Sequence, residues 1–152
     1  MNPSLAVEVF DTLHELQHLF RSRMRKSMEA VHPDLTFNEM RVLMRAGRHP
    51  GLTQRDLVEN SHADKAQMAR VLAHLQDRGL LTRSASKADK RVRCLHLSEQ
   101  GQKVFARMRG LQERVAAELL ADCAPSFQGQ LLASLREVRT GAIARAEMPV
   151  SP

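Results

Sequence analysis

The stretch of sequence that decides the fold covers residues 52–97 and reads LTQRDLVENSHADKAQMARVLAHLQDRGLLTRSASKADKRVRCLHL. Thr53 is suited to cap a short helix that ends at Asn60, because its hydroxyl accepts a hydrogen bond from a free amide of the first turn. A second helix is expected from Asp64 to Arg78. One face of this helix is apolar and carries Met68, Val71, Leu72 and Leu75. The pattern predicts a helix-turn-helix.

A β-hairpin is predicted directly after these helices. Gly79 ends the second helix, and residues 80–83 and 93–97 alternate apolar and polar side chains as paired strands do. Between the strands lies a polar, basic tip, residues 84–92. A helix-turn-helix that is followed by such a hairpin is a winged helix-turn-helix.

Two helices are predicted before residue 52. Residues 36–39 read Thr-Phe-Asn-Glu, a capping box, and open a helix that we expect to end before Gly47. A long first helix starts at Leu5 and ends at residues 32–34, His-Pro-Asp, because the residue before proline avoids the helical region. Apolar side chains recur along it every three or four positions: Val9, Leu13, Leu16, Phe20, Met24 and Met28.

Two further helices are predicted after the hairpin. Ser98 caps a long fifth helix, and residues 123–125, Cys-Ala-Pro, separate it from a last helix. The apolar positions are Val104, Met108, Leu111, Val115 and Leu119 in the fifth helix, and Leu131, Leu132, Leu135 and Val138 in the last. We expect residues 149–152 to form a disordered tail.

The predicted fold is mainly α with a small β-hairpin wing. A winged helix-turn-helix at about residues 36–97 is flanked by N- and C-terminal dimerisation helices at about 5–31 and 98–146, within a single domain of residues 1–148. The outer helices cannot bury both of their faces against one small winged module. Pairing with a second copy would bury them, so a two-fold homodimer is expected.

Composition and charge favour a polyanionic partner. The 152 residues include 23 Lys and Arg against 17 Asp and Glu, which gives a net charge of +6 and a pI of about 10.1. Eight of the basic residues and only three acidic ones lie between residues 64 and 93, as nucleic-acid binding would require. The sequence has no run of 18 apolar residues and no signal-peptide pattern at its start. We therefore expect a cytoplasmic protein without a membrane partner.

Lys65 and Gln67 are the side chains best placed to read bases. They lie opposite the apolar stripe of the Asp64–Arg78 helix, and the second helix of a helix-turn-helix enters the major groove of DNA. There, glutamine bonds adenine and lysine bonds the acceptors of guanine. In the hairpin tip, Arg91 is the candidate for a narrow minor groove. For the tip taken alone, a solvated charged loop is the alternative.

Five segments together resemble the MarR family of multiple antibiotic resistance regulators. They are LTQRDL (52–57), DKAQMAR (64–70), LQDRGLL (75–81), DKR (89–91) and LSEQG (97–101), and they span about half of the chain. The resemblance implies a homodimeric transcriptional regulator, most often a repressor, that binds a near-palindromic duplex operator. A non-specific architectural protein that coats DNA is the alternative.

The resemblance also implies roles for single residues. The Asp-x-Arg pattern of the family's wing falls on Asp89 and Arg91, so Asp89 should pair with an arginine and brace the wing while Arg91 enters the minor groove. Ala66 and Ala69 depart from the family, in which hydroxyl residues are frequent at these positions. The expected DNA contacts are Gln54, Lys65, Gln67, Arg70, Ser84, Lys87, Asp89, Lys90 and Arg91.

A small ligand is also implied by the resemblance, since many members release DNA when an aromatic acid or phenol binds between the dimer helices and the winged module. His14, His18 and Arg21 form a polar stripe at i, i+4 and i+7 of the first helix, and the second helix offers Met40 and Met44. A solvated stripe or polar contacts across the dimer are the alternatives. His14 and His18 could also share a metal ion, but no third ligand is evident.

Other classes of protein find little support. Cys94 and Cys123 have no CxxC spacing, so we expect inert thiols rather than a zinc site, with a thiol-responsive regulator as the alternative. No GxSxG, HExxH or phosphate-loop pattern occurs, and we expect neither an enzyme nor a cofactor. Binding of single strands or RNA by stacking is disfavoured, because the chain has no Trp, no Tyr and five Phe.

Overall fold

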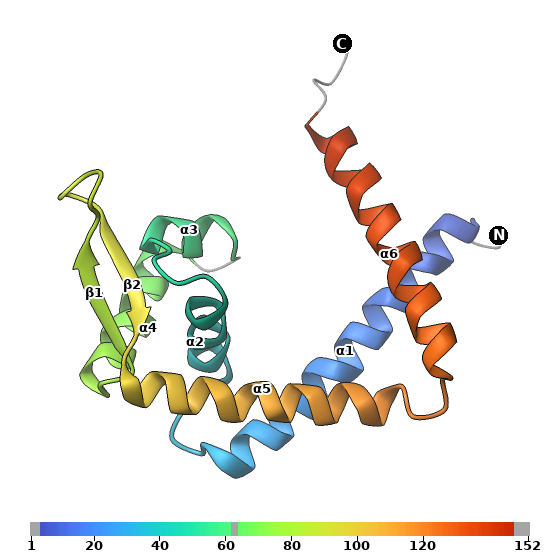
Figure 1. Cartoon of the computed structure of the whole chain (residues 1–152), viewed down its shortest axis with the longest axis horizontal. Coiled ribbons are helices and arrows are strands. Elements are labelled where there is room, and N and C mark those ends of the chain that lie inside the picture. Colours follow the sequence, from blue (N-terminus) through green and yellow to red (C-terminus); the bar gives the residue numbers. More distant parts are fainter. Residues whose placement is uncertain (1–3, 62–63, 148–152) are drawn as a thin grey trace. The chain divides into compact units, whose positions relative to one another are not determined.

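The computed structural model describes residues 4–61 and 64–147, which form six helices and one hairpin (Figure 1). The elements are α1 (Leu5–Val31), α2 (Phe37–Arg48), α3 (Gln54–Glu59), α4 (Lys65–Asp77), β1 (Leu81–Ala85), β2 (Arg93–Leu97), α5 (Glu99–Leu119) and α6 (Pro125–Ala146). This order confirms the predicted mainly helical fold with a hairpin wing. The tail at residues 149–152 lies outside the described residues.

The chain groups into two compact units, residues 1–115 and 116–152. The first unit holds the helix-turn-helix, the hairpin and the hydrophobic core. The largest fully buried side chains in that core are Met40, Leu43, Leu72, Leu75, Leu95 and Met108. The second unit holds α6, in which no residue is buried. Whether the whole chain folds as one domain stays a prediction.

The helix starts follow from capping residues. The Thr36 hydroxyl accepts a hydrogen bond from the Glu39 amide (3.2 Å), and the Glu39 carboxylate accepts one from the Thr36 amide (2.9 Å). This is the predicted capping box of α2. Ser4 caps α1, and Pro125 is the first residue of α6, just after the break expected at residues 123–125.

The end of α2 differs from the prediction. The helix continues through Gly47 to Arg48, so this glycine does not terminate it. A Cβ atom at Gly47 would lie 2.5 Å from the ring of Phe105 in α5. The missing side chain of Gly47 therefore leaves room for the Phe105 ring, and Gly51, with a φ of 86°, makes the turn that follows the helix.

The hairpin is slightly longer than predicted. Its register pairs Leu81 with Leu97 and Ala85 with Arg93, so β1 includes Ser84 and Ala85, which we had assigned to the tip. The tip is confined to residues 86–92. The Leu95 amide donates to Leu52 O (2.8 Å), which ties β2 to the chain just before α3. The wing is thus anchored to the helix-turn-helix through the backbone.

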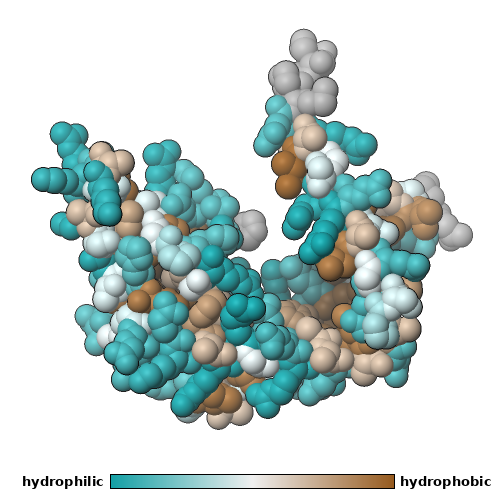
Figure 2. Space-filling model, in the orientation of Figure 1, coloured by the Kyte–Doolittle hydropathy of each residue, from teal (hydrophilic) through white to brown (hydrophobic). Residues whose placement is uncertain are grey.

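The outer helices leave large apolar side chains exposed. On α1 these are Leu5, Val7, Val9, Phe10, Leu16, Leu19 and Val31. On α6 they are Phe127, Leu132, Leu135, Val138 and Ile143. Figure 2 shows brown, apolar surface along α6. Buried residues of α1 are confined to Met24 and Met28 in its second half.

The first turn of α5 is locked to the end of α4. The Ser98 hydroxyl accepts from the Gly101 amide (3.0 Å) and donates to Gly79 O, and the Ser98 amide donates to Leu80 O (3.0 Å). A Cβ atom at Gly101 would lie 2.1 Å from Leu80 O. Since that atom belongs to the backbone, no side-chain movement makes room for it.

Two glycine substitutions in α5 should therefore have opposite effects. Gly101→Ala should lower the free energy of unfolding by about 1–3 kcal/mol, because it forces the two backbones apart. Gly110→Ala meets nothing within 4 Å and should raise it by about 0.5–1 kcal/mol, because alanine loses less backbone entropy in a helix. Urea unfolding followed by circular dichroism measures both, and equal effects would contradict the close contact at Gly101.

Candidate nucleic-acid interface

The helix α4 has one buried and one exposed face. Met68, Leu72 and Leu75 are buried in the core, whereas Lys65, Gln67 and Arg70 are exposed. Asp64 caps the helix by accepting a hydrogen bond from the Gln67 amide (2.6 Å). The first turn, which a helix-turn-helix directs at DNA, is thereby ordered while its polar side chains stay free of the core.

The last turn of α4 is fixed by two polar contacts. His74 Nδ1 contacts the buried Glu39 carboxylate of α2. Arg78, the C-cap residue, forms an ion pair with Asp34 and donates to Asp34 O (2.6 Å). Both contacts join α4 to the segment around the start of α2, so α4 cannot turn about its axis without breaking them.

The preceding helix, α3, is stabilised by a capping box of its own. The Asp56 carboxylate accepts from the Thr53 amide (2.8 Å), and the Thr53 hydroxyl accepts from the Asp56 amide (3.1 Å). The hydrogen bond from the Thr53 amide is the main cause that lowers the pKa of Asp56, and the hydrogen bond with the Thr53 side chain lowers this pKa further. The carboxylate therefore stays ionised and keeps α3 capped at neutral pH. Gln54 lies half-buried in the first turn.

The tip of the wing is organised by short polar bonds. The Ser86 amide donates to Val92 O (2.9 Å), and the Ser86 hydroxyl accepts from the Ala88 amide (3.2 Å). Asp89 accepts from the Arg91 amide (2.9 Å). Exposed basic side chains surround this turn: Lys87, Lys90, Arg91 and Arg93.

The partner of Asp89 differs from the one that the family resemblance implied. We expected an arginine side chain, but the carboxylate binds the backbone amide of Arg91, and no ion pair of Asp89 is found among the described residues. An aspartate two residues before an amide readily closes such a turn. Asp89 thus still braces the wing, and it leaves the Arg91 guanidinium exposed.

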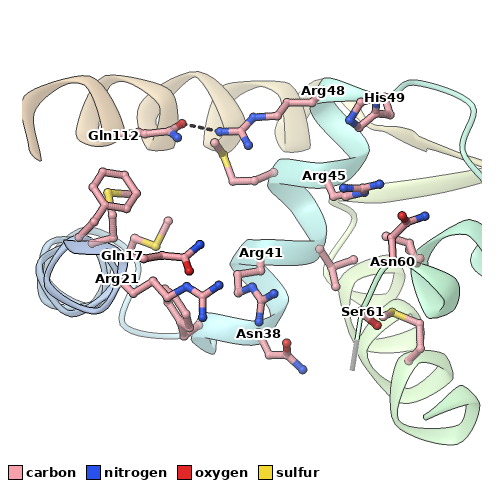
Figure 3. A pocket seen from close by; sticks show the side chains of 18 of the residues that line it. Gln17, Arg21, Asn38, Arg41, Arg45, Arg48, His49, Asn60, Ser61 and Gln112 are labelled. Atoms are coloured by element: carbon pink, nitrogen blue, oxygen red, sulfur yellow. Dashed lines mark hydrogen bonds between the residues drawn. The ribbon is translucent and has the colours of Figure 1, made fainter. Parts of the chain in front are cut away.

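A cavity of about 500 Å³ lies beside the start of α4 (Figure 3). Its apolar lining includes the buried side chains of Met24, Met28, Val42, Met44, Leu57 and Met68. Its basic lining comprises Arg21 of α1 and Arg41, Arg45 and Arg48 of α2. Asn38, Asn60, Ser61, Gln67 and Gln112 add polar groups. None of the described residues that line the cavity is acidic, so the cavity suits an anion with an apolar body.

Comparison with known proteins places this architecture in a family. A model of the MarR family matches residues 35–92, from the start of α2 to the wing. The transcriptional regulator HosA of Escherichia coli is 30% identical over 125 residues, which cover 82% of this chain and 92% of HosA. The chain belongs to the MarR family of DNA-binding transcriptional regulators. The family resemblance and the winged-helix fold expected from the sequence are confirmed.

Solved MarR-family structures share the fold. A MarR regulator from Methanosarcina mazei Go1 superposes with a TM-score of 0.74 at 20% identity, covering 90% of this chain and 96% of that one. A mutant MarR from E. coli complexed with operator DNA superposes with a TM-score of 0.69 at 18% identity, covering 88% of this chain and 94% of that one. At these identities the likeness concerns the fold alone.

The residues predicted to contact DNA in this MarR-family chain lie on three elements of the first unit. Lys65, Gln67 and Arg70 are exposed on α4, with Gln67 and Arg70 on the side opposite the buried residues and Lys65 in the first turn. Gln54 belongs to α3, and Ser84, Lys87, Asp89, Lys90 and Arg91 belong to the hairpin and its tip. Their role as DNA contacts stays a prediction.

The five residues predicted to bind a ligand are not brought together. Arg21 and Met44 line the cavity, but Met40 is 0% exposed and belongs to the core. His14 lines a separate shallow hollow on α1, and His18 lines neither. The helical stripe of His14, His18 and Arg21 extends further toward the N-terminus than the cavity does.

Three arginines of the cavity were missed in the sequence. Arg41, Arg45 and Arg48 stand at i, i+4 and i+7 of α2, which is the spacing of one helix face. This periodicity is present in the sequence, but it does not show that the arginine face of the helix borders a cavity. Gln112 of α5, which binds Arg48 (2.6 Å), carried no local signal.

Metal binding and membrane insertion gain no support. Within residues 4–61 and 64–147, no three His, Cys, Asp or Glu side chains are grouped as metal ligands would be. No helix in this part of the chain is long and apolar enough to cross a membrane. Cys94 and Cys123 are half-buried free thiols.

Gln67→Ala should reduce base discrimination more than it reduces overall DNA affinity. A bidentate base contact is worth about 1–3 kcal/mol of discrimination, whereas phosphate contacts carry most of the non-specific affinity. Competition between duplexes that differ at one base pair measures the loss. Gln102→Ala, an exposed glutamine of α5, serves as the matched control. Equal weakening by Gln67→Ala on all duplexes would contradict a base-reading role.

Proposed function

We propose that the chain is a homodimeric repressor that binds a near-palindromic duplex operator and is released by a small aromatic acid. The observation that carries the proposal is the two-sided α4. Its apolar face is fixed in the core, its opposite face with Gln67 and Arg70 is exposed, and Lys65 is exposed in its first turn. A rigid helix with a polar outer face can enter the major groove without rearrangement.

The proposed dimer rests on the exposed apolar surface of the outer helices. Phe10 of α1 is 64% exposed and Leu132 of α6 is 47% exposed, and each has several exposed apolar neighbours on its own helix. Patches of this extent on a chain that is otherwise charged indicate a protein interface. A two-fold dimer is the simplest assembly that covers the same surface on both copies.

A two-fold dimer also defines the geometry of the operator. Each copy presents one α4 and one wing, and the two α4 helices are related by the dimer axis. They can enter successive major grooves on one side of the duplex, about 34 Å apart. The operator should therefore be an inverted repeat, while the basic wings contact the flanking minor grooves.

Release by a ligand is supported by the position of the cavity. Gln67, the proposed base-reading residue, lines the cavity together with Arg21 and Met44. A molecule bound there contacts α1, α2 and the first turn of α4 at once. The arginines attract the carboxylate of this molecule, and the methionines contact its ring. Because the bound molecule also contacts Gln67, it competes with the side-chain position that Gln67 needs for DNA binding.

Charges placed on α6 should separate the dimer. Introducing Leu132→Asp together with Leu135→Asp should halve the mass of the particle in solution, because two buried carboxylates would lack partners in the interface. Light scattering after gel filtration measures the mass, and circular dichroism checks that the helices persist. Gln130→Asp, at an exposed polar position of the same helix, is the control. A wild-type protein with the mass of one chain would contradict the dimer.

Benzoate should weaken binding to duplex DNA, and Arg21→Gln should reduce this effect. The loss of a charge-assisted hydrogen bond is expected to raise the benzoate concentration needed for release by about tenfold. Fluorescence anisotropy of a labelled duplex measures release at constant ionic strength. Arg109→Gln on the exposed side of α5 is the control. Acetate that released DNA as well as benzoate would show that the cavity does not recognise the ring.

A further inference from the structure

The arginines of the cavity form a row that is too long for a single carboxylate. Arg41, Arg45 and Arg48 stand on one face of α2, and Arg21 faces them from α1. At a rise of 1.5 Å per residue, the Cα atoms of Arg41 and Arg48 are about 10 Å apart along the helix. One carboxylate binds one guanidinium in a bidentate pair, so it leaves the far end of the row without a counter-charge.

The arginines of this row make no ion pair within the described part of the chain. Among the residues that the structure describes, Arg21, Arg41 and Arg45 have no hydrogen bond or ion pair through their side chains. Arg48 donates to Gln112, a neutral group (2.6 Å). Asp56 places a negative charge near Arg45, but its carboxylate accepts its hydrogen bond from the Thr53 amide and not from Arg45.

The two ends of the row present different binding groups. Figure 3 shows the guanidinium groups of Arg21 and Arg41 extending into the same space between α1 and α2. At the other end, Arg48 reaches toward α5, where it meets Gln112. An anion at this second end would replace the neutral Gln112 oxygen as the acceptor for Arg48.

Arg45 stands between the two ends of the row, and the cavity beside the row has an apolar lining. The buried methionine and aliphatic side chains of this lining are Met24, Met28, Val42, Met44, Leu57 and Met68. The rings of Phe20 and Phe37 line the same cavity. Methionine adapts its shape to a ring and makes favourable contacts with it. A cavity of about 500 Å³ lies within the range of 300–1,000 Å³ typical of sites for drug-sized ligands.

We propose that the cavity binds an elongated dianion, with an apolar, aromatic body and a negatively charged group at each end. One end binds Arg21 and Arg41, and the other binds Arg48. The inference rests on the proposed function in that it assigns the ligand to the same cavity, and it names the charge and length of that ligand. A monoanion such as benzoate fills only one end.

The test compares two probes that share one ring system. Biphenyl-4,4′-dicarboxylate and biphenyl-4-carboxylate are titrated into the full-length protein by calorimetry at constant ionic strength. The dianion should bind at least about tenfold more tightly, which is the gain expected for one added charge-assisted contact. Equal affinities in the wild-type protein would overturn the proposal, and this comparison does not depend on any variant.

Two variants test which residues produce the preference. Arg41→Gln and Arg48→Gln, at opposite ends of the row, should each reduce the preference for the dianion to about onefold to threefold, because either change removes one anion-binding end. Arg109→Gln, which lies outside the cavity, should leave the preference intact. A preference unchanged in both row variants would place the binding elsewhere and overturn the assignment.

Failure of this inference and failure of the proposed function are distinguishable. If benzoate releases DNA but the dianion has no advantage, the proposed function stands and the dianion is wrong. If the dianion is preferred but does not release DNA, the inference stands and ligand control is wrong. If no probe binds, and Arg41→Gln lowers the salt dependence of DNA binding, the row contacts DNA phosphates and the inference is overturned.

Discussion

The burial of one face of α4 is the constraint on which the rest of the structure depends. Met68, Leu72 and Leu75 fix the helix against α2, and the pairs His74–Glu39 and Arg78–Asp34 fix its rotation. Because the apolar face points inward, Gln67 and Arg70 point outward, and Lys65 is exposed in the first turn. The hydrogen bonds of Ser98 to the end of α4 then set where α5 begins. The exposed surface of α4 that we propose to read DNA is thus a consequence of core packing.

Much of this arrangement could be predicted because it depends on local chemistry. Thr36 with Glu39 specifies the start of α2, and the spacing from Met68 to Leu75 specifies which side of α4 is buried. The alternation of residues 80–83 and 93–97 predicted the wing, the resemblance to MarR proteins predicted the family, and the comparison with HosA confirmed that family. Side-chain capping and helical periodicity act within a few residues, so they can be read directly from the chain.

The remaining features depend on contacts between distant parts of the chain. Gly47 follows the pattern of a helix end, yet it lies inside α2, where its missing side chain leaves room for the Phe105 ring. Met40 and Met44 look equivalent in the sequence, and both are buried in the core, but only Met44 also lines the cavity. The bond between Arg48 and Gln112 joins residues that are 64 positions apart. No local pattern shows which side of α2 would face a cavity.

Selection of bound duplexes from a random DNA pool at physiological salt tests the central claim most directly. At that salt concentration, non-specific binding to phosphates is weakened, so enrichment reports base recognition. A dimer that reads bases through two α4 helices should enrich an inverted repeat with half-sites about one helical turn, or about 34 Å, apart. Strong binding without any enriched motif would contradict this account and would identify a protein that coats DNA without reading its sequence.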